Sequence, residues 1–368
     1  MLIMENFKKI IKRILRVVGI TLISIVCIVL AYVLYVFFSY KRIDDHQVLN
    51  VCKAMAGDSI EKASVGNEYT IVSYNIGFGA YDPRFTFFMD GGKSSWATSK
   101  ESVQRLVTGA GELTQGFDPD FVLFQEIDFD STRSYHVNQL DMLRRMFAEY
   151  DNTMGVNYDS PFLLYPFNQP HGTSRAGVGT FSRYNIEDAE RRSLPIANNF
   201  SKFVDLDRCF TVNRIPVSNG KYLVLINLHM SAYGSSPSVR EGQTGLLKEV
   251  LEKEYSEGNY VIAGGDFNHD LKLTEDTQTY SWAHFYDRNL LPEHFTFAMD
   301  QLPSEEKDAL SNSCRDSGVV YDPETTYTVT LDGFIVSDNI EMTYYTNNAG
   351  GFLYSDHEPV IMKFKLKL

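Results

Sequence analysis

The sequence is poor in cysteine, tryptophan and basic residues. Its 368 residues include four Cys and two Trp, with 34 Lys and Arg against 47 Asp and Glu. The cysteines are widely spaced and Cys27 lies in an apolar run, so the three that are left do not indicate a disulfide framework. The sequence shows no internal repeat, and 44% hydrophobic with 22% charged residues excludes global disorder.

The shortage of basic residues is concentrated in the chain beyond residue 42. Residues 1–42 hold seven of the 34 Lys and Arg and one of the 47 acids, which leaves a formal charge of −19 on the rest. Proteins that bind nucleic acid normally carry the opposite sign, because they neutralise phosphates with Lys and Arg. The composition therefore argues against a nucleic-acid partner, although a local basic strip would be compatible with it.

One long stretch without formal charge runs from Val17 to Tyr40. About 20 apolar residues in a helix cross the hydrocarbon core of a bilayer, so residues 17–40 predict a transmembrane helix. Five of the first 16 residues are Lys or Arg, whereas the two cations after the stretch are followed at once by Asp44 and Asp45. This excess predicts a single-pass cell-membrane protein with a basic cytoplasmic segment, residues 1–16, and an extracytoplasmic C-terminal part.

A cleaved signal peptide is the alternative interpretation of this N-terminus. Its apolar core would be only about 7–15 residues long, with small residues close behind it. The sequence Ala54-Met55-Ala56 has the small-x-small form but lies too far beyond the apolar run. An uncleaved anchor is therefore favoured.

The rest of the chain divides into a polar segment and one long domain. Residues 41–68 are polar, contain Gly57 and Gly66, and predict a stalk that could extend by about 90 Å. From residue 69 to 368, short apolar strands alternate with amphipathic helices, two of which begin at capping boxes that start at Thr98 and Ser238. Because no linker-like break interrupts the series, we expect one α/β domain.

Polar residues follow or adjoin the apolar strands of this domain at six places. The motifs are Ser73-Tyr74-Asn75, Gln125-Glu126, Asn227-Leu228-His229, Gly265-Asp266-Phe267-Asn268, Asp332-Gly333 and Ser355-Asp356-His357. Each motif alone is more typical of a turn, an exposed strand end or a structural histidine. Six of them at strand boundaries indicate a site, because rigid strand ends converge along one edge of a sheet and fix the groups that they present.

In this order the motifs resemble the endonuclease/exonuclease/phosphatase superfamily. Gly-Asp266-Phe-Asn268 and Ser-Asp356-His357-Glu-Pro are the most specific of them, and the resemblance spans the chain from about residue 69 to its end. His229 is similar to the deoxyribonuclease I and sphingomyelinase branches, since abasic-site endonucleases have tyrosine there. The resemblance implies a four-layer α/β sandwich, with two mixed sheets face to face and helices outside.

The resemblance also implies a metal cofactor, Mg²⁺ or Mn²⁺. Glu126 would hold the ion, with Asn75 and Asp356 nearby. Ligation by oxygen alone suits these hard cations and does not suit zinc.

The catalytic roles implied by the resemblance fall on five residues. His357 would be the imidazole near the attacking water, oriented by Asp332. Asp266 would position that water or deprotonate it. Asn268 and His229 would bind the non-bridging phosphoryl oxygens, where negative charge develops.

Three stretches look like additions to the catalytic frame: residues Gly77–Ala97, Asn157–Arg175 and His269–Ser317, the last of which carries Trp282. Their aromatic side chains would either form a rim that contacts lipid or bases, or pack down as a satellite core. Arg175 and Arg183 flank a Gly-rich strand and are candidate substrate-binding residues.

The leading functional prediction is a membrane-anchored, extracytoplasmic Mg²⁺-dependent phosphoesterase. It would hydrolyse a phosphodiester or phosphomonoester, and the partner would be a lipid headgroup, a small molecule or nucleic acid. One alternative is an extracellular non-specific nuclease, and another is a non-catalytic surface binding module. The chain keeps every catalytic residue of the resemblance, which disfavours the last.

Overall fold

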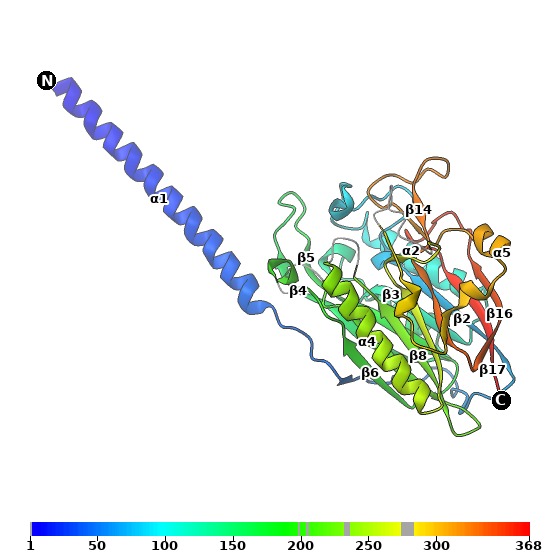
Figure 1. Cartoon of the computed structure of the whole chain (residues 1–368). Helices are drawn as coiled ribbons and strands as arrows, with labels where there is room; N and C mark the ends of the chain where they lie inside the picture. Colours follow the sequence, from blue (N-terminus) through cyan, green and yellow to red (C-terminus); the bar gives the residue numbers. More distant parts are fainter. Residues whose placement is uncertain (1, 198, 204–205, 232–235, 274–282) are drawn as a thin grey trace. The chain divides into compact units, whose positions relative to one another are not determined.

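The computed structural model describes residues 2–197, 199–203, 206–231, 236–273 and 283–368 (Figure 1). Trp282, which the sequence singled out, lies outside the described residues. The chain forms two compact units, Met1–Arg42 and Ile43–Leu368.

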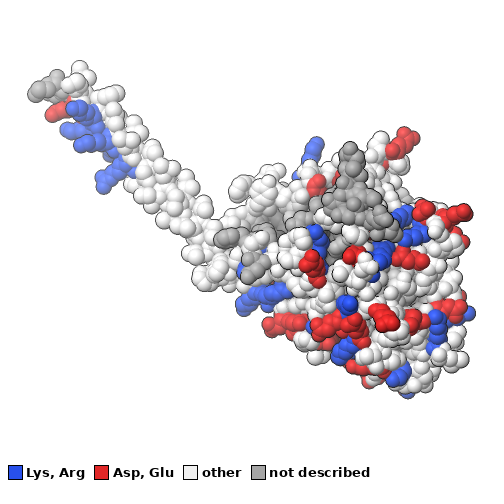
Figure 2. Space-filling view, in the orientation of Figure 1, with Lys and Arg blue, Asp and Glu red and all other residues white. Residues whose placement is uncertain are grey.

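The first unit is a single helix, α1, from Leu2 to Ser39. By length and composition it is able to span a membrane. The predicted basic segment and the predicted transmembrane segment are thus parts of one continuous helix. Figure 2 shows its Lys and Arg side chains gathered at one end, with the rest of its visible surface free of charged residues. The direction in which the chain crosses a membrane stays a prediction.

The second unit is built on two mixed sheets, whose strand orders are β1-β6-β7-β8-β9-β15-β12 and β16-β17-β2-β3-β5-β4. The first contains β1 Gln47–Val48, β6 Asp188–Ser193, β7 Cys209–Pro216, β8 Tyr222–His229, β9 Tyr260–Asp266, β12 Phe295–Phe297 and β15 Asp332–Ser337. The second contains β2 Glu68–Asn75, β3 Phe121–Asp128, β4 Asp151–Leu163, β5 Gly172–Ser182, β16 Ile340–Asn347 and β17 Val360–Leu366. The pairs β8/β9 and β2/β3 are parallel, and the other pairs are antiparallel.

Helices cover the outer faces of the sheets. The longer helices are α2 Lys100–Gln115, α3 Gln139–Met146 and α4 Pro237–Ser256, and α5 Ser304–Ala309 is short. Single 3-10 turns occupy Gly77–Gly79, Phe88–Asp90, Thr132–Ser134, Phe200–Phe203, Arg288–Leu290 and Ala298–Gln301. Two-residue strands pair as β10 His269–Asp270 with β11 His284–Phe285, and as β13 Cys314–Arg315 with β14 Thr328–Val329.

Two apolar cores hold these layers together. The larger core joins the facing sides of the two sheets, where Ile71 and Leu123 belong to the same cluster as Leu225 and Ile262, and it extends to the buried side of α4. The smaller core lies under α2 and α3, where Val107 packs with the outward side chains of β2 and β3. Alternating strand residues thus feed two different cores, which confirms the predicted four-layer α/β arrangement.

The segment predicted as a stalk differs from the expectation. From Ile43 onward it belongs to the second unit. Strand β1 pairs with β6, Cys52 bridges Asn152, and Ala63 is fully buried. Although the segment is polar on average, a few apolar side chains and backbone hydrogen bonds hold it against the sheets. Only Tyr40–Arg42 join the helix to the second unit.

Candidate functional site

Three neighbouring strands of the first sheet place polar residues at the same level. His229 on β8 lies opposite Asp266 on β9, and Asp266 lies opposite Asp332 on β15. All three residues are at most 2% exposed. Residues directly opposite on neighbouring strands project to the same face, with Cβ atoms about 5 Å apart. The register alone therefore brings these three side chains together.

The second sheet supplies the facing half of the site. Asn75 at the end of β2 lies opposite Gln125 on β3. The register of β3 against β5 is irregular between Phe124 and Ile127, and Glu126 has a left-handed φ of 55°. An irregularity of this kind redirects a side chain at a strand end. It explains why Glu126 is half-buried at the site while Gln125 is buried between the sheets.

Gln125 also connects the two sheets. Its Nε2 donates a hydrogen bond to Asn227 Oδ1 at 2.8 Å, and Asn227 Nδ2 donates to the backbone oxygen of Gly179 at 2.9 Å. These buried amides link β3 and β5 of one sheet to β8 of the other. Because a buried hydrogen bond is costly to break, this bridge fixes the spacing of the two sheets just below the site.

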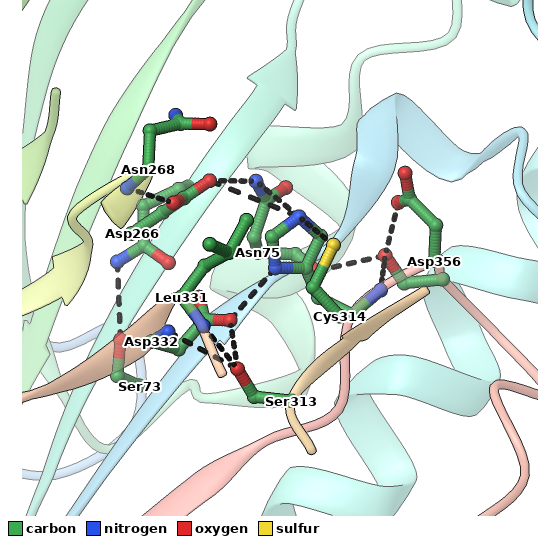
Figure 3. A network of polar contacts seen from close by, with 12 residues as sticks. Ser73, Asn75, Asp266, Asn268, Ser313, Cys314, Leu331, Asp332 and Asp356 are labelled. Carbon is green, nitrogen blue, oxygen red and sulfur yellow. Dashed lines mark hydrogen bonds and ion pairs between the residues drawn. The ribbon is translucent and has the colours of Figure 1, made fainter. Parts of the chain in front are cut away.

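Asp266 is the central group of the site (Figure 3). Its Oδ2 accepts a hydrogen bond from Asn75 Nδ2 at 3.0 Å, and lies 3.6 Å from His229 Nε2 and 3.7 Å from His357 Nε2. Its Oδ1 accepts from the backbone N–H of Asn268 at 2.8 Å. One carboxylate thus faces two imidazoles and an amide that come from three other chain segments.

His357 is held on its other side by a chain of hydrogen bonds. Its Nδ1 lies 2.8 Å from Asp332 Oδ2, which also accepts from Ser313 Oγ at 2.7 Å. Ser313 Oγ in turn accepts the backbone N–H groups of Leu331 and Asp332. The Asp332 carboxylate accepts a hydrogen bond from the proton on Nδ1 and fixes the orientation of the ring, so Nε2 is the atom presented to the site.

The surroundings raise the pKa of both Asp266 and His357, the first through burial and the second through nearby negative charge. Burial raises the pKa of Asp266 to about 7, against the opposing positive charge of His357. Burial alone would lower the pKa of His357, but the negative charges around it, chiefly Asp332, outweigh this and hold it well above its ordinary value. Asp266 is therefore suited to accept a proton near neutral pH, and His357 is suited to remain an imidazolium.

His229 and Asn268 lie beside Asp266 as the sequence predicted. Burial, followed by the positive charge of Arg208, lowers the pKa of His229 well below its ordinary value, so its imidazole is neutral. Its buried Nδ1 has no hydrogen-bond partner among the described residues. Asn268 has a left-handed φ of 51°, and its Nδ2 donates to the backbone oxygen of Met230 at 3.0 Å. This bond orients the Asn268 amide next to the site.

The residues predicted to hold a metal have donors that fit a hard divalent cation. Burial raises the pKa of Asp356 to about 6; the positive charges of His357 and Arg315 oppose this, and the negative charge of Glu126 adds to it. A bound Mg²⁺ or Mn²⁺ would neutralise the repulsion between the Asp356 and Glu126 carboxylates. Asn75 presents its nitrogen to Glu126 Oε1 at 3.3 Å, while its Oδ1 accepts from Gly77 N–H.

A second group of metal-competent atoms adjoins the first, since Asn75 contacts Asp266. Asp266, Asp332 and His357 each offer one ligand atom, and these atoms lie within 4.8 Å of one another. The Nδ1 of His357 is already engaged by Asp332. The Glu126 side of the site therefore has the oxygen-rich donors, and the Asp332 side has the hydrogen-bonded imidazole.

The two predicted substrate-binding arginines lie in different places. Arg175 sits where β5 passes the end of β3, over the ring of Phe129 and 3.8 Å from Asp159. Arg183 lies at the opposite end of β3, roughly 20 Å away along the strand, where it pairs with Asp118. The structure thus brings Arg175 to the edge that carries Glu126 and does not bring Arg183 there.

Sequence reasoning missed Arg208. It immediately precedes β7, at the strand end beside His229, and is 6% exposed. Its Nε and Nη1 atoms are buried without a hydrogen-bond partner among the described residues. Leaving a buried guanidinium unpaired is costly, so an anion is the natural partner for these donors. Its position one residue before a strand of the site was the available signal.

Ser313 and Cys314 were missed as well. Cys314 is buried, its Sγ lies 3.5 Å from His357 Nε2, and burial raises its thiol pKa to about 12. The backbone of Ser313 accepts from Glu358 N–H, and that of Arg315 donates to Asp356. The segment is thus a backbone neighbour of the Ser-Asp-His motif. It lies more than 40 residues away from that motif in sequence, and no local pattern marks it.

Three loops surround the site, and we call them the rim: residues 77–97, 160–171 and 315–321. The aromatic side chains of the first loop pack down: Phe78, Tyr81 and Phe85 are buried in the smaller core. In the second loop Tyr165 is 65% and Phe167 83% exposed. Of the two alternatives that the sequence left open, a satellite core therefore describes the first loop, and an exposed rim describes the second.

Comparison with known proteins identifies the fold. A sequence profile of the Endonuclease/Exonuclease/phosphatase family matches residues 72–357. An endonuclease/exonuclease/phosphatase from Beutenbergia cavernae DSM 12333 superposes with a TM-score of 0.58 at 15% identity, covering 82% of this chain and 72% of that one. A Bacteroides vulgatus protein described in the same words gives 0.53 at 18% identity, covering 82% and 100%. No curated protein sequence matches the chain.

A third solved structure is D. rerio TDP2 complexed with single strand DNA product. It superposes with a TM-score of 0.53 at 15% identity and covers 81% of this chain and 99% of that one. At these identities the structural likeness shows the fold, and the sequence profile, which spans all six strand-end motifs, shows the family. This chain belongs to the endonuclease/exonuclease/phosphatase family.

Proposed function

We propose that the chain is a metal-dependent phosphoesterase that acts at the Asp266 edge of its two sheets. The observation that carries the proposal is the convergence of His357, His229 and Asn75 on one Asp266 oxygen. A hydrolase of phosphoesters needs an acceptor for the proton of water and several donors for the phosphoryl oxygens. This site offers both within the reach of one phosphate.

The shifted pKa values divide the roles. Asp266, with its pKa raised by burial to about 7, takes the proton of the attacking water. His357, kept as an imidazolium by Asp332, stabilises the charge that develops on the phosphoryl group. The oxygen of water forms a bond to phosphorus, the ester P–O bond breaks, and the departing oxygen takes up a proton from solvent and leaves as the alcohol.

The remaining donors hold the phosphate in place. The amide of Asn268, the neutral imidazole of His229 and the buried Nε and Nη1 of Arg208, which no described residue pairs, bind the non-bridging oxygens. Arg175, further out at the same edge, contacts the part of the substrate beyond the phosphate. Arg183 has no place in this proposal, because it lies at the other end of β3.

Glu126 and Asp356, with Asn75 beside them, would hold Mg²⁺ or Mn²⁺. The cation supplies charge neutralisation for the phosphoryl or leaving oxygen.

The proposed setting is the outer surface of a membrane, with α1 as the anchor and a phosphodiester or phosphomonoester as substrate. Support comes from the length and apolar composition of α1 and from the Lys and Arg near its start. A nuclease would use the same chemistry, but the second unit is acidic. On the face shown in Figure 2 its Lys and Arg are interspersed with Asp and Glu. Duplex nucleic acid would favour a continuous basic surface.

The test is hydrolysis by the full-length chain of three substrate classes: a soluble aryl diester, a phospholipid in a bilayer, and single- or double-stranded DNA. Each is assayed with Mg²⁺, with Mn²⁺ and with EDTA followed by restored metal. Metal-dependent release of phosphate or alcohol from the diester or the lipid supports the proposal. Turnover of DNA alone would favour the nuclease. Inertness toward every substrate, together with no metal binding in a titration, would favour a binding module.

A further inference from the structure

The loop between β4 and β5 exposes apolar side chains next to the site. Tyr165 is 65% and Phe167 83% exposed, whereas aromatic side chains of this size are normally buried in a soluble domain. No Asp, Glu, Lys or Arg occurs between Asp159 and Arg175. His171 is buried, and burial lowers its pKa to about 3, so it adds no charge. The loop is therefore uncharged in a unit that carries a formal charge of −19.

The structure fixes this loop instead of leaving it loose. Trp96 Nε1 donates to the backbone oxygen of Pro170 at 2.6 Å, and Gln169 Oε1 accepts from the backbone N–H of Ser95 at 2.9 Å. The ring of Tyr165 packs against Phe88, with centroids 5.9 Å apart. The exposed rings are thus presented outward by hydrogen bonds at the base of the loop, which is a preorganised arrangement.

The other two rim loops add apolar side chains. Met89, Val319 and Val320 are each about half exposed or more. The loops touch one another, since the backbone N–H of Phe87 donates to the oxygen of Ser317 at 2.9 Å. Exposed apolar groups on three connected loops mark a contact surface and are not scattered single residues.

The rim is continuous with the catalytic edge. Its first loop begins at Gly77, whose N–H binds Asn75 Oδ1, and its third loop begins at Arg315, whose N–H donates to the oxygen of Asp356. Strand β5, which leaves the second loop, passes Asp128 opposite Ala176, two residues beyond Glu126. The first and third rim loops thus begin at residues that contact the site, and the second loop leaves the strand that pairs with β3 near Glu126.

The geometry points to a bilayer as the occupant of this surface. We propose that Tyr165 and Phe167 enter the interfacial layer of the membrane and that the site acts on a phosphoester headgroup of that same membrane. This inference rests on the proposed phosphoesterase function and narrows its substrate class. Tyr165, whose ring carries a hydroxyl, is of the kind favoured at the boundary between headgroups and acyl chains, and the ring of Phe167 adds apolar area. An uncharged apolar tip would gain nothing from a polyanion such as DNA.

A short connection links α1 to the second unit. Residues Tyr40–Arg42 are the whole connection between the end of α1 and the second unit. A connection of this length spans at most about 14 Å. If α1 anchors the chain in a bilayer, this short connection raises the local concentration of lipid around the second unit, which favours lipid as the occupant of an exposed apolar surface.

The test uses the full-length chain in phosphatidylcholine liposomes, so α1 gives every variant the same anchor. Phe167→Trp is compared with Tyr344→Trp, which replaces a 48% exposed aromatic on β16, outside the rim. We expect the emission of Phe167→Trp to shift to the blue, and brominated phosphatidylcholine to quench it at least about twofold more than the control. Equal quenching in the two variants overturns the membrane contact.

A second measurement tests the substrate class. The double variant Tyr165→Ser with Phe167→Ser should hydrolyse bilayer phospholipid about tenfold more slowly and leave the soluble diester unchanged, while Tyr344→Ser changes neither. An equal loss on both substrates contradicts the inference. If the wild type hydrolyses phosphoesters but Phe167→Trp is not quenched more than the control, the rim proposal is wrong and the proposed function stands. If Phe167→Trp is quenched but no phosphoester is hydrolysed, the rim contacts the membrane and the proposed function is wrong.

Discussion

The strand-end site and the rim differ in how each is built. The site residues Asp266, Asp332 and His357 are at most 5% exposed, and several hydrogen bonds to the two sheets hold them. The rim residue Phe167 is 83% exposed, and hydrogen bonds fix only the base of its loop. The sheets therefore hold the groups that carry out the reaction, while the loops beside them select the substrate that reaches those groups.

The difference teaches where each kind of variation will be tolerated. A change in the site breaks a buried network and removes turnover on every substrate, because all substrates share the phosphoryl group. A change in the rim alters the choice of substrate and leaves the reaction alone. The following predictions test this division, from the largest expected effect to the smallest.

The largest effect is expected for Asp332→Asn. Loss of the carboxylate that orients His357 should lower kcat on the order of 10³-fold on every substrate, because the imidazole loses both its fixed orientation and the negative charge that keeps it protonated. Asp338→Asn, just beyond the other end of β15, is the matched control and should retain wild-type kcat. Steady-state kinetics with a circular dichroism check of folding measure both. Equal kcat in the two variants would contradict the assigned role.

A smaller effect is expected for Arg208→Ala. Because the Nε and Nη1 atoms of Arg208 are buried without partners among the described residues, they should bind the substrate phosphate, and their removal should lower kcat/KM on the order of 10²-fold. Arg183→Ala, at the far end of β3, should change kcat/KM by less than about twofold. If Arg183→Ala were the more damaging variant, the placement of the phosphate would be wrong.

The next prediction concerns pH and the base of the rim. Burial, followed by the charge of Arg133, lowers the pKa of His171 to about 3, so the unfolded chain binds a proton that the folded chain does not. Stability is therefore complete above the unfolded pKa of about 6.5 and falls as the pH drops toward 3. From pH 7.5 to 5 the loss from this group should be on the order of 2 kcal/mol.

His171→Gln, which keeps polar atoms near Ser95 and Ser174, should remove that part of the pH dependence. The measurement is the free energy of unfolding of wild type and variant at the two pH values. The same loss in both proteins would show that His171 is not the group responsible.

The smallest effect is expected for Ser313→Ala. Ser313 positions Asp332 and touches no reacting atom, so its loss should lower kcat about tenfold, and Ser313→Thr should restore most of it. In the Asp332→Asn background, Ser313→Ala should have no further effect on kcat, since the hydrogen bond that it supplies no longer orients His357. Independent, additive losses would assign Ser313 a purely structural role.

Much of this site could be predicted because its residues stand at strand ends. Asn75, His229, Asp266 and Asp332 end or begin strands, and the periodicity of an apolar strand is visible in sequence. The two-sheet arrangement followed from the resemblance that these residues carry. No strand pattern predicted the hydrogen bond from Gln125 to Asn227 that links the two sheets, because this contact depends on how the sheets pack.

Other features escaped prediction because they depend on contacts that are distant in sequence. Ser313 donates to Asp332 from a segment whose sequence has no regular pattern. Arg208 is recognised only from the structure, where its Nε and Nη1 are buried without a partner among the described residues. Residues 43–68 look polar, yet Ala63 is buried against the first sheet. The first helix of the second unit is capped by Ser99 in place of Thr98, a one-residue shift that local sequence does not resolve.

The most direct test of the central claim is hydrolysis of bis-p-nitrophenyl phosphate by the full-length chain beside His357→Ala. The account predicts turnover with Mg²⁺ or Mn²⁺, none in EDTA, and a loss on the order of 10³-fold in the variant. Turnover that survives in EDTA, or a His357→Ala variant as active as wild type, would contradict it.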